Sequence, residues 1–188
     1  MRKLILFNMI TLDGFFAGPA GEIDWHQVDD EFNQYAIDQL QEAGGLIFGR
    51  VTYQLMASYW PTPQALQDDP QVAEKMNSLP KFVASRTLQD VEWSNTRLLK
   101  GDATEELSRL KAAPGADLFI FGSANLAASL MKKGLIDEYR LIVNPVVIGK
   151  GIPMFQNPHL PQRFRLARTR AFRNSNVLLV YQPALEEE

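Results

Sequence analysis

The chain has 188 residues, of which 46% are hydrophobic, and it has a net charge of −3 and no cysteine. This length predicts a single domain, residues 1–188, and this composition predicts a full apolar core. The charge gives no general attraction to nucleic acid or anionic membranes, and the absence of cysteine excludes disulfides, thiolate metal sites and a cysteine nucleophile.

A continuous apolar run opens the chain. Residues 3–10 predict a strand covered on both faces, and the run is too short for the core of a signal peptide or for a membrane span. Asp13 and Gly14 lie just after it, and the glycines that follow predict a mobile loop over residues 15–24. We therefore expect a cytoplasmic protein whose partner is a small molecule, with no membrane or nucleic-acid partner.

The first helix follows an acidic pair. Asp29 or Asp30 is expected to cap this helix, which runs to about Ala43. Gly44 and Gly45 are expected to end it, because glycine tolerates the left-handed conformation of a helix C-cap. Its apolar face is predicted to consist of Phe32, Tyr35, Ala36, Leu40 and Ala43.

Strands and helices alternate through the rest of the chain. Strands are predicted at residues 46–48, 81–84, 95–99, 117–121 and 139–148, and a terminal hairpin at 165–172 and 177–181. Helices are predicted from residues 49–52 to about Met56, after a cap at Asp102, and at 126–131 before Gly134, while residues 61–80 are expected to form a surface excursion with some helix at 72–77. This order implies an α/β fold with a mostly parallel central sheet, flanking helices and an antiparallel C-terminal edge.

Three strand ends carry residues suited to phosphate, at positions 49–52, 85–86 and 122–125. In open α/β sheets, ligands bind beyond the carboxyl ends of strands, and a helix N-terminus offers unpaired N–H groups to an anion. Arg50 and Arg86 add guanidinium groups that match phosphate. Each turn alone also fits a plain tight turn or a solvated arginine, but together they predict a ligand with several phosphates, such as a dinucleotide with an additional ribose phosphate.

Two carboxylates near the first loop are the candidate catalytic residues. Asp13 and Asp30 could bind substrate N–H groups or relay a proton, although Asp13 also fits a turn and Asp30 a helix cap. His26 and His159 lack ligand spacing, so no metal site is expected, and both are expected to be surface residues. The chain carries no G-x-G-x-x-G fingerprint after a strand, no phosphate-loop motif and no nucleophile elbow.

Five ordered segments resemble the dihydrofolate-reductase-like superfamily. The most similar branch is the C-terminal reductase domain of the bacterial riboflavin-biosynthesis deaminase/reductase (RibD), with its stand-alone relatives. The segments are residues 11–17 (TLDGFFA), 49–53 (GRVTY), 81–88 (KFVASRTL), 118–123 (LFIFGS), and 135–139 (LIDEY) continuing through 145–151 (PVVIGKG) to Phe155.

This resemblance implies a sheet of about eight strands with NADPH lying across its carboxyl edge. Arg50 and Thr52 would contact phosphates, and Ser85 and Arg86 would contact the adenosine ribose phosphate that distinguishes NADPH from NADH. Residues 16–21 would close over the nicotinamide, with Trp25 behind them. The implied cofactor-binding residues are Ala17, Gly49, Arg50, Thr52, Ser85, Arg86, Gly122, Ser123, Ala124 and Asn125.

The resemblance also implies an NADPH-dependent reductase of a pterin or a ribosylamino-pyrimidine, similar to 5-amino-6-(5-phosphoribosylamino)uracil reductase. The alternatives are a true dihydrofolate reductase and a non-catalytic NADPH-binding protein. Asp30 lies five residues after Trp25, close to the spacing of the dihydrofolate reductase acid, but Ser123 stands where those enzymes have the second of two glycines, which favours the riboflavin branch. Relatives of this type often pair, so a homodimer is expected. Residues 139–147 would form a central strand or extend the dimer surface.

Overall fold

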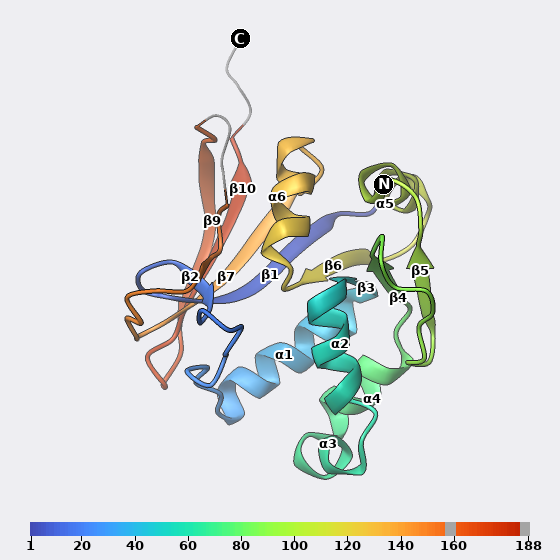
Figure 1. Cartoon of the computed structure of the whole chain (residues 1–188). Coiled ribbons are helices and arrows are strands. Elements are labelled where there is room, and N and C mark those ends of the chain that lie inside the picture. Colours follow the sequence, from blue (N-terminus) through green and yellow to red (C-terminus); the bar gives the residue numbers. More distant parts are fainter. Residues whose placement is uncertain (157–160, 185–188) are drawn as a thin grey trace.

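Strands and helices alternate along the chain, as the apolar patterns predict. The computed structural model describes residues 1–156 and 161–184 (Figure 1). The elements are β1 (Leu4–Thr11), β2 (Phe15–Ala17), α1 (Asp30–Glu42), β3 (Ala43–Gly49), α2 (Arg50–Tyr59), α3 (Pro63–Asp68), α4 (Pro70–Ser78), β4 (Lys81–Ala84), β5 (Thr96–Leu99), α5 (Ala103–Ala112), β6 (Asp117–Phe121), α6 (Ala124–Lys132), β7 (Glu138–Asn144), β8 (Ile152–Pro153), β9 (Phe164–Ala171) and β10 (Val177–Pro183).

Eight of these strands form one sheet in the order β5-β4-β3-β6-β1-β7-β10-β9. Neighbours from β5 to β7 are parallel, whereas β10 runs antiparallel to both β7 and β9. The predicted α/β fold, with a mostly parallel sheet and an antiparallel C-terminal edge, is confirmed. β7 lies between β1 and β10, so this segment is a central strand.

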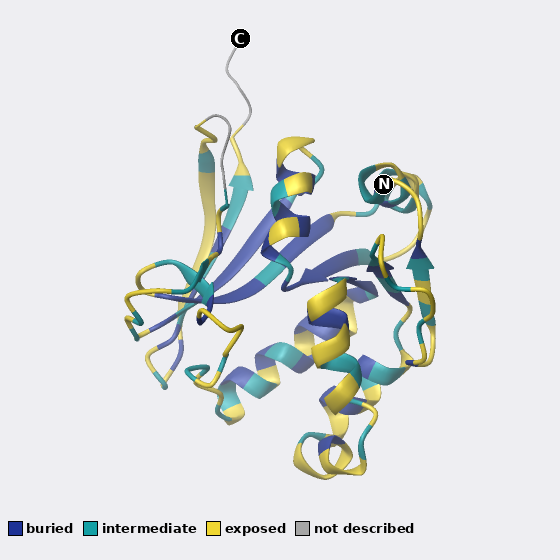
Figure 2. Ribbon diagram, in the orientation of Figure 1, coloured by how far each residue is buried: buried dark blue, intermediate teal, exposed yellow. Residues whose placement is uncertain are grey.

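Helices cover both faces of the sheet. On one face, α5 and α6 pack through Leu107, Leu126 and Leu130 against β1 and β6. On the other, α1, α2 and α4 pack against β3, β4 and β6. The central strands are therefore buried on both sides, while β9 at the edge is largely exposed (Figure 2).

Gly44 and Gly45 do not cap α1, contrary to the prediction. The helix ends at Glu42, and both glycines belong to β3 beside β6. A Cβ atom on Gly44 would overlap the carbonyl oxygen of Ala116. The glycine pair therefore serves the close approach of β3 to the chain entering β6.

Four other features differ from prediction. Within residues 61–80, the expected helix at 72–77 is part of α4, but this helix buries Val72 and Met76 in the core, so this part is not a surface excursion. β7 ends at Asn144 instead of continuing to residue 148, because Pro145 has no N–H for the ladder. The first loop contains β2, which pairs with β8, and α2 continues to Tyr59.

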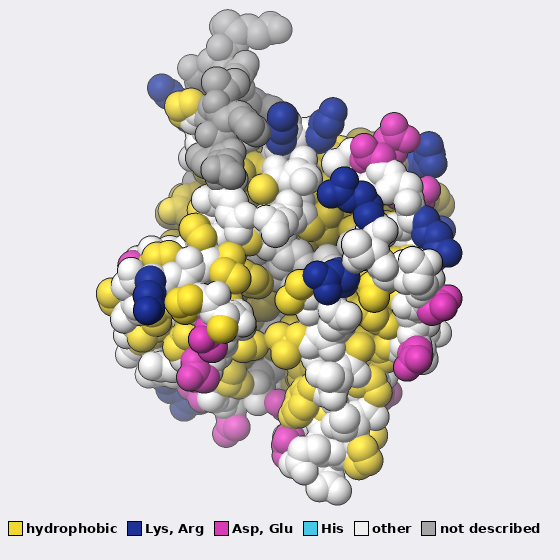
Figure 3. All heavy atoms as spheres, viewed as in Figure 1, with side chains coloured by type: hydrophobic (Ala, Val, Ile, Leu, Met, Phe, Trp, Pro, Cys, Tyr) yellow, Lys and Arg dark blue, Asp and Glu magenta, His cyan; other side chains and the backbone are white. Residues whose placement is uncertain are grey.

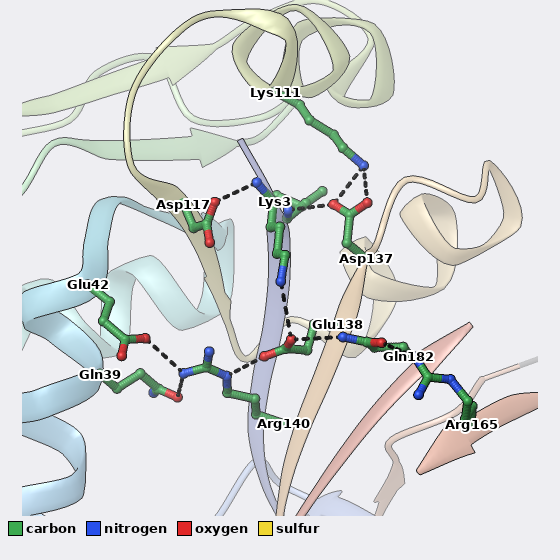
Figure 4. Close-up of polar contacts among 11 residues, drawn as sticks. Lys3, Gln39, Glu42, Lys111, Asp117, Asp137, Glu138, Arg140, Arg165 and Gln182 are labelled. Carbon is green, nitrogen blue, oxygen red and sulfur yellow. Dashed lines mark hydrogen bonds and ion pairs between the residues drawn. The ribbon is translucent and has the colours of Figure 1, made fainter. Parts of the chain in front are cut away.

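β7 also buries a charged pair on its α1 side. Arg140 Nε donates to Glu138 Oε1 at 2.7 Å, and the two residues are only 9% and 7% exposed (Figure 4). Arg140 Nη1 lies 3.3 Å from Gln39 Oε1 of α1. This network ties the second half of α1 to the centre of the sheet. None of the helices in residues 1–156 and 161–184 is long and apolar enough to span a membrane.

Candidate functional site

The three phosphate-suited turns lie side by side at the carboxyl edge of the sheet. Gly49 at the end of β3 pairs with Ala84 at the end of β4, so Ser85 and Arg86 follow directly beside it. β6 pairs with the other side of β3, which places the turn at Gly122 next to the start of α2. The predicted residues of all three turns therefore form one edge.

Direct hydrogen bonds join the first and third turns. The Ser123 hydroxyl oxygen accepts the Gly49 N–H at 2.7 Å and lies 3.1 Å from Thr52 Oγ1. Thr52 Oγ1 in turn accepts the Ser123 N–H at 3.1 Å. Thr52 is 8% exposed, so these bonds are largely shielded from water. The turns consequently behave as one unit, which fits a role in holding a single extended ligand.

Gly122 is required by both conformation and space. Its φ is +65°, a left-handed value that glycine adopts without penalty. A Cβ atom there would lie 2.7 Å from Thr52 Cγ2 and Oγ1 and 3.3 Å from Phe16 Cζ. Ser123 follows with φ 58° and ψ 66°, although it is not glycine. Its two hydroxyl contacts offset the cost of this conformation.

The helix N-termini at this edge have no side-chain caps. Asp29, Thr62 and Asp102 cap α1, α3 and α5 with side-chain oxygens, whereas no side chain caps α2, α4 or α6, and of these α2 and α6 begin at this edge. Their first N–H groups and the positive ends of their dipoles are left for another acceptor. Because both point to the edge where the turns are joined, the arrangement suits an anion with more than one phosphate.

Basic side chains lie on two of the turns. Arg50 opens α2 and is exposed, with Nη1 donating to Gln54 Oε1 at 3.1 Å. Arg86 is also exposed. Ser85 shapes its turn, because its hydroxyl oxygen accepts the N–H groups of Thr87 at 3.2 Å and Leu88 at 3.0 Å. Ala124 is buried and Asn125 is exposed in the first turn of α6.

The short ribbon of β2 and β8 forms the opposite wall of a hollow. Figure 3 shows this hollow between the lobe that carries β2 and the side of α2 and α6, with Lys and Arg side chains on the α2 side. Ala17 is 3% exposed, and a side chain on Gly151 would overlap its carbonyl oxygen. Ala17 therefore lies in the ribbon, across the hollow from the turns.

The two candidate carboxylates have different surroundings. Asp13 accepts the Gly149 N–H at 2.8 Å and the Ile148 N–H at 3.4 Å. A hydrogen bond from Thr11, together with these backbone donors, lowers the pKa of Asp13. Asp30 is exposed in the first turn of α1, and its neighbour Asp29 is the cap. Both carboxylates are exposed to solvent, but Asp13 is engaged in anchoring a turn.

His26 is not the plain surface residue expected. Its ring meets that of Trp25 edge to face at a centroid distance of 4.5 Å, and burial lowers the pKa of His26 to about 4. His26 Nε2 and Trp25 Nε1 are buried without a hydrogen-bond partner among the described residues. His159 lies outside the described residues. Within residues 1–156 and 161–184, no group of three or more His, Asp or Glu residues could hold a metal ion.

The sequence patterns assigned no role to Asn8, which forms a hydrogen bond with the turn at Gly122. Its side chain is 3% exposed and accepts the Gly122 N–H at 2.8 Å. The signal was a single polar residue inside the apolar run of β1. Such a residue needs buried partners, but the run does not indicate which ones.

Comparison with known proteins supports a reductase-like fold. The model of the RibD C-terminal domain family matches residues 2–178. The uncharacterized protein YyaP of Bacillus subtilis (strain 168) is 31% identical over 180 residues, covering 96% of this chain and 94% of that protein. A putative riboflavin biosynthesis protein from Shewanella sp. PV-4 superposes with a TM-score of 0.75 at 24% identity, covering 98% of this chain and 100% of the other. Dihydrofolate reductase from Enterococcus faecalis, complexed with NADP(H) and RAB-propyl, superposes with a TM-score of 0.66 at 12% identity, covering 96% of each chain.

Proposed function

The chain belongs to the RibD C-terminal domain family, and on this premise we propose that it is an NADPH-dependent reductase of a ribosylamino-pyrimidine or pterin. The observation that carries the proposal is the pair of uncapped helix N-termini, joined through Ser123, Gly49 and Thr52. Neighbouring helices that both leave their first N–H groups free are suited to a dinucleotide pyrophosphate.

Each turn has a distinct role in this proposal. The N–H groups of Ala124 and Asn125 at the start of α6 bind the pyrophosphate, and Gly122 provides the left-handed turn that leads into this helix. Arg50 adds a charge at the start of α2. Ser85 and Arg86 bind the ribose phosphate, because they extend from the strand next to Gly49.

NADPH, when bound, supplies the hydride. The ribbon of β2 and β8 shields the reacting groups from water. His26 is neutral near pH 7, because burial lowers its pKa to about 4, so it does not act as the acid. Asp13 stays ionised and anchors residues 148–149, which leaves Asp30 to manage a proton through water.

Titration with NADPH and NADH, followed by tryptophan fluorescence and nicotinamide absorbance, tests the proposal. We expect NADPH to bind more tightly than NADH, and hydride transfer to a ribosylamino-pyrimidine to consume it. Absence of NADPH binding at high micromolar concentration would contradict the proposal. Binding without turnover of any pyrimidine or pterin would leave a non-catalytic NADPH-binding protein as the function.

Arg86→Ala is expected to raise the Kd of NADPH about tenfold or more and to leave the Kd of NADH unchanged. The reason is that a hydrogen bond to a charged group contributes about 1.5–3 kcal/mol, and only NADPH carries the ribose phosphate. The matched control is Arg109→Ala, which removes the same charge from the exposed face of α5, where Arg109 pairs with Glu105 and Glu106. Equal losses for both cofactors would argue against this role of Arg86.

Dihydrofolate reduction is the second candidate. It is favoured by Asp30, an accessible carboxylate in the first turn of α1 five residues after Trp25, and by the superposition on a dihydrofolate reductase. Turnover of dihydrofolate that disappears in Asp30→Asn would support it. If the wild-type chain oxidises NADPH with a ribosylamino-pyrimidine but not with dihydrofolate, this candidate fails.

A further inference from the structure

We propose that Asn8 is a positioning residue that couples the cofactor turn at Gly122 to the ribbon of β2 and β8. The two walls of the hollow are then ordered together. This inference rests on the proposed function only for the identity of the ligand, and one arm of its test needs no ligand.

Asn8 is a polar residue inside an apolar layer. It lies on β1 between Leu6 and Ile10, which share its face of the strand and belong to the core under α6. Its side chain is 3% exposed. A buried amide lowers stability unless both its donor and its acceptor are used, so the partners of Asn8 determine its effect.

Those partners belong to opposite walls of the hollow. Asn8 Oδ1 accepts the N–H of Gly122 at 2.8 Å, and Asn8 Nδ2 donates to Met154 Sδ at 2.9 Å. Met154 directly follows β8 and is 2% exposed. One planar amide therefore holds the peptide of the cofactor turn at one end and the ribbon at the other.

Further contacts connect Met154 through β2 back to the turn at Gly122. Met154 donates its N–H to the Gly14 carbonyl at 3.0 Å, just before β2. β2 pairs with β8, and Phe16 of β2 reaches the position where a Gly122 side chain would stand. Rotation of the Gly122 peptide must break the Asn8 bond or turn the amide away from Met154. The orientation of the cofactor turn and the position of the ribbon are thus linked.

Asn8→Leu and Met154→Leu test the link from its two ends. Asn8→Leu removes both hydrogen bonds, and Met154→Leu removes only the sulfur acceptor at nearly constant volume. In the cofactor-free protein, we expect Asn8→Leu to speed hydrogen exchange at the amides of both Gly122 and Met154. We expect it to raise the Kd of NADPH about tenfold, which corresponds to about 1.4 kcal/mol.

The response of the second variant separates coupling from a local packing role. Met154→Leu does not touch Gly122, yet we expect it to raise the Kd of NADPH about twofold to threefold, and the double variant to lose no more than Asn8→Leu alone, because both changes break one bridge. Leu110→Ala, a truncation of a partly buried leucine of α5 that packs against the core, is the control for lost stability and should leave both amides and the Kd unchanged.

The outcomes are distinguishable. If Asn8→Leu lowers the melting temperature but leaves the Gly122 amide and the Kd of NADPH as in wild type, the proposal is overturned. Additive effects of the two variants on the Kd would overturn it as well. If the wild-type chain binds no NADPH, the proposed function fails, and the exchange of the two amides in the cofactor-free protein still decides whether Asn8 couples them.

Discussion

Gly122→Ala is expected to weaken NADPH binding about 100-fold or more, equal to about 2.7 kcal/mol. Alanine at φ +65° costs about 1–2 kcal/mol relative to glycine, and its Cβ would lie 2.7 Å from Thr52 Cγ2 and Oγ1. Thr52 must therefore move. Because Thr52 Oγ1 accepts the Ser123 N–H, its displacement separates the two helix N-termini that are proposed to bind the phosphates. Isothermal calorimetry with NADPH measures the loss.

Gly134→Ala is the matched control for Gly122→Ala. Gly134 has φ +63°, almost the same conformation, but a Cβ atom there would meet nothing within 4 Å. We expect it to lower the free energy of unfolding by about 1–2 kcal/mol and to leave the Kd of NADPH unchanged. If Gly122→Ala and Gly134→Ala bound NADPH equally well, the turn at Gly122 would not be the phosphate site.

The elements that sequence predicted best are those whose signals are local. β6 begins at Asp117 and ends at Phe121 as predicted, because a short apolar run stops at Gly122. Asp102 caps α5 as predicted, with its carboxylate accepting the N–H of Thr104. The fold class followed from the order of such segments. It did not require any knowledge of which strands are neighbours.

The errors arise where distant segments decide the conformation. Gly44 and Gly45 have the composition of a helix stop, but the approach of β6 makes them strand residues. β2 and β8 have three and two residues, too few for any periodic pattern, and they exist because they pair with each other. A ribbon of this kind becomes visible only once the chain is folded.

The candidate site likewise has features that the sequence could predict and features that depend on distant segments. The three turns could be predicted because each follows an apolar strand, and parallel strands bring their carboxyl ends to one edge. Ser123 was expected among the cofactor-binding residues, but its pattern did not indicate that its hydroxyl accepts the N–H of Gly49 from a segment 74 residues away. Which side chains face a ligand and which join the turns depends on the placement of β6 beside β3.

Charged residues in β7 were the least predictable part of the core. Residues 139–148 were predicted as an apolar strand, yet Glu138 and Arg140 lie on its α1 face among Gln39 and Lys3 (Figure 4). Alternation along the strand indicates that they share a face, but it cannot indicate that the face is covered by α1. Because this pair is buried, substitution of one partner is expected to lower the free energy of unfolding strongly.

Arg140→Met is expected to lower the free energy of unfolding by about 3–5 kcal/mol, because it leaves the carboxylate of Glu138 buried without its main partner. The remaining contacts of that carboxylate are Gln182 Nε2 at 3.4 Å and the half-exposed Lys3 Nζ at 3.8 Å. Neither replaces a 2.7 Å bond from a guanidinium. Urea denaturation, followed by circular dichroism, measures the change.

Two further variants show whether this loss comes from the unpaired charge. The double variant Glu138→Leu with Arg140→Met should recover most of the stability, since apolar residues of similar volume often replace a buried ion pair without loss. Arg168→Met on exposed β9 makes the same substitution without burial and should change stability by less than about 0.5 kcal/mol.

If the double variant were as unstable as Arg140→Met alone, the contacts of Arg140 with α1 and with the Phe119 ring, 5.2 Å from its guanidinium carbon, would be the source of the stability. The charged pair would then serve to fix α1 on the sheet, and with it the position of Asp30 at the other end of that helix.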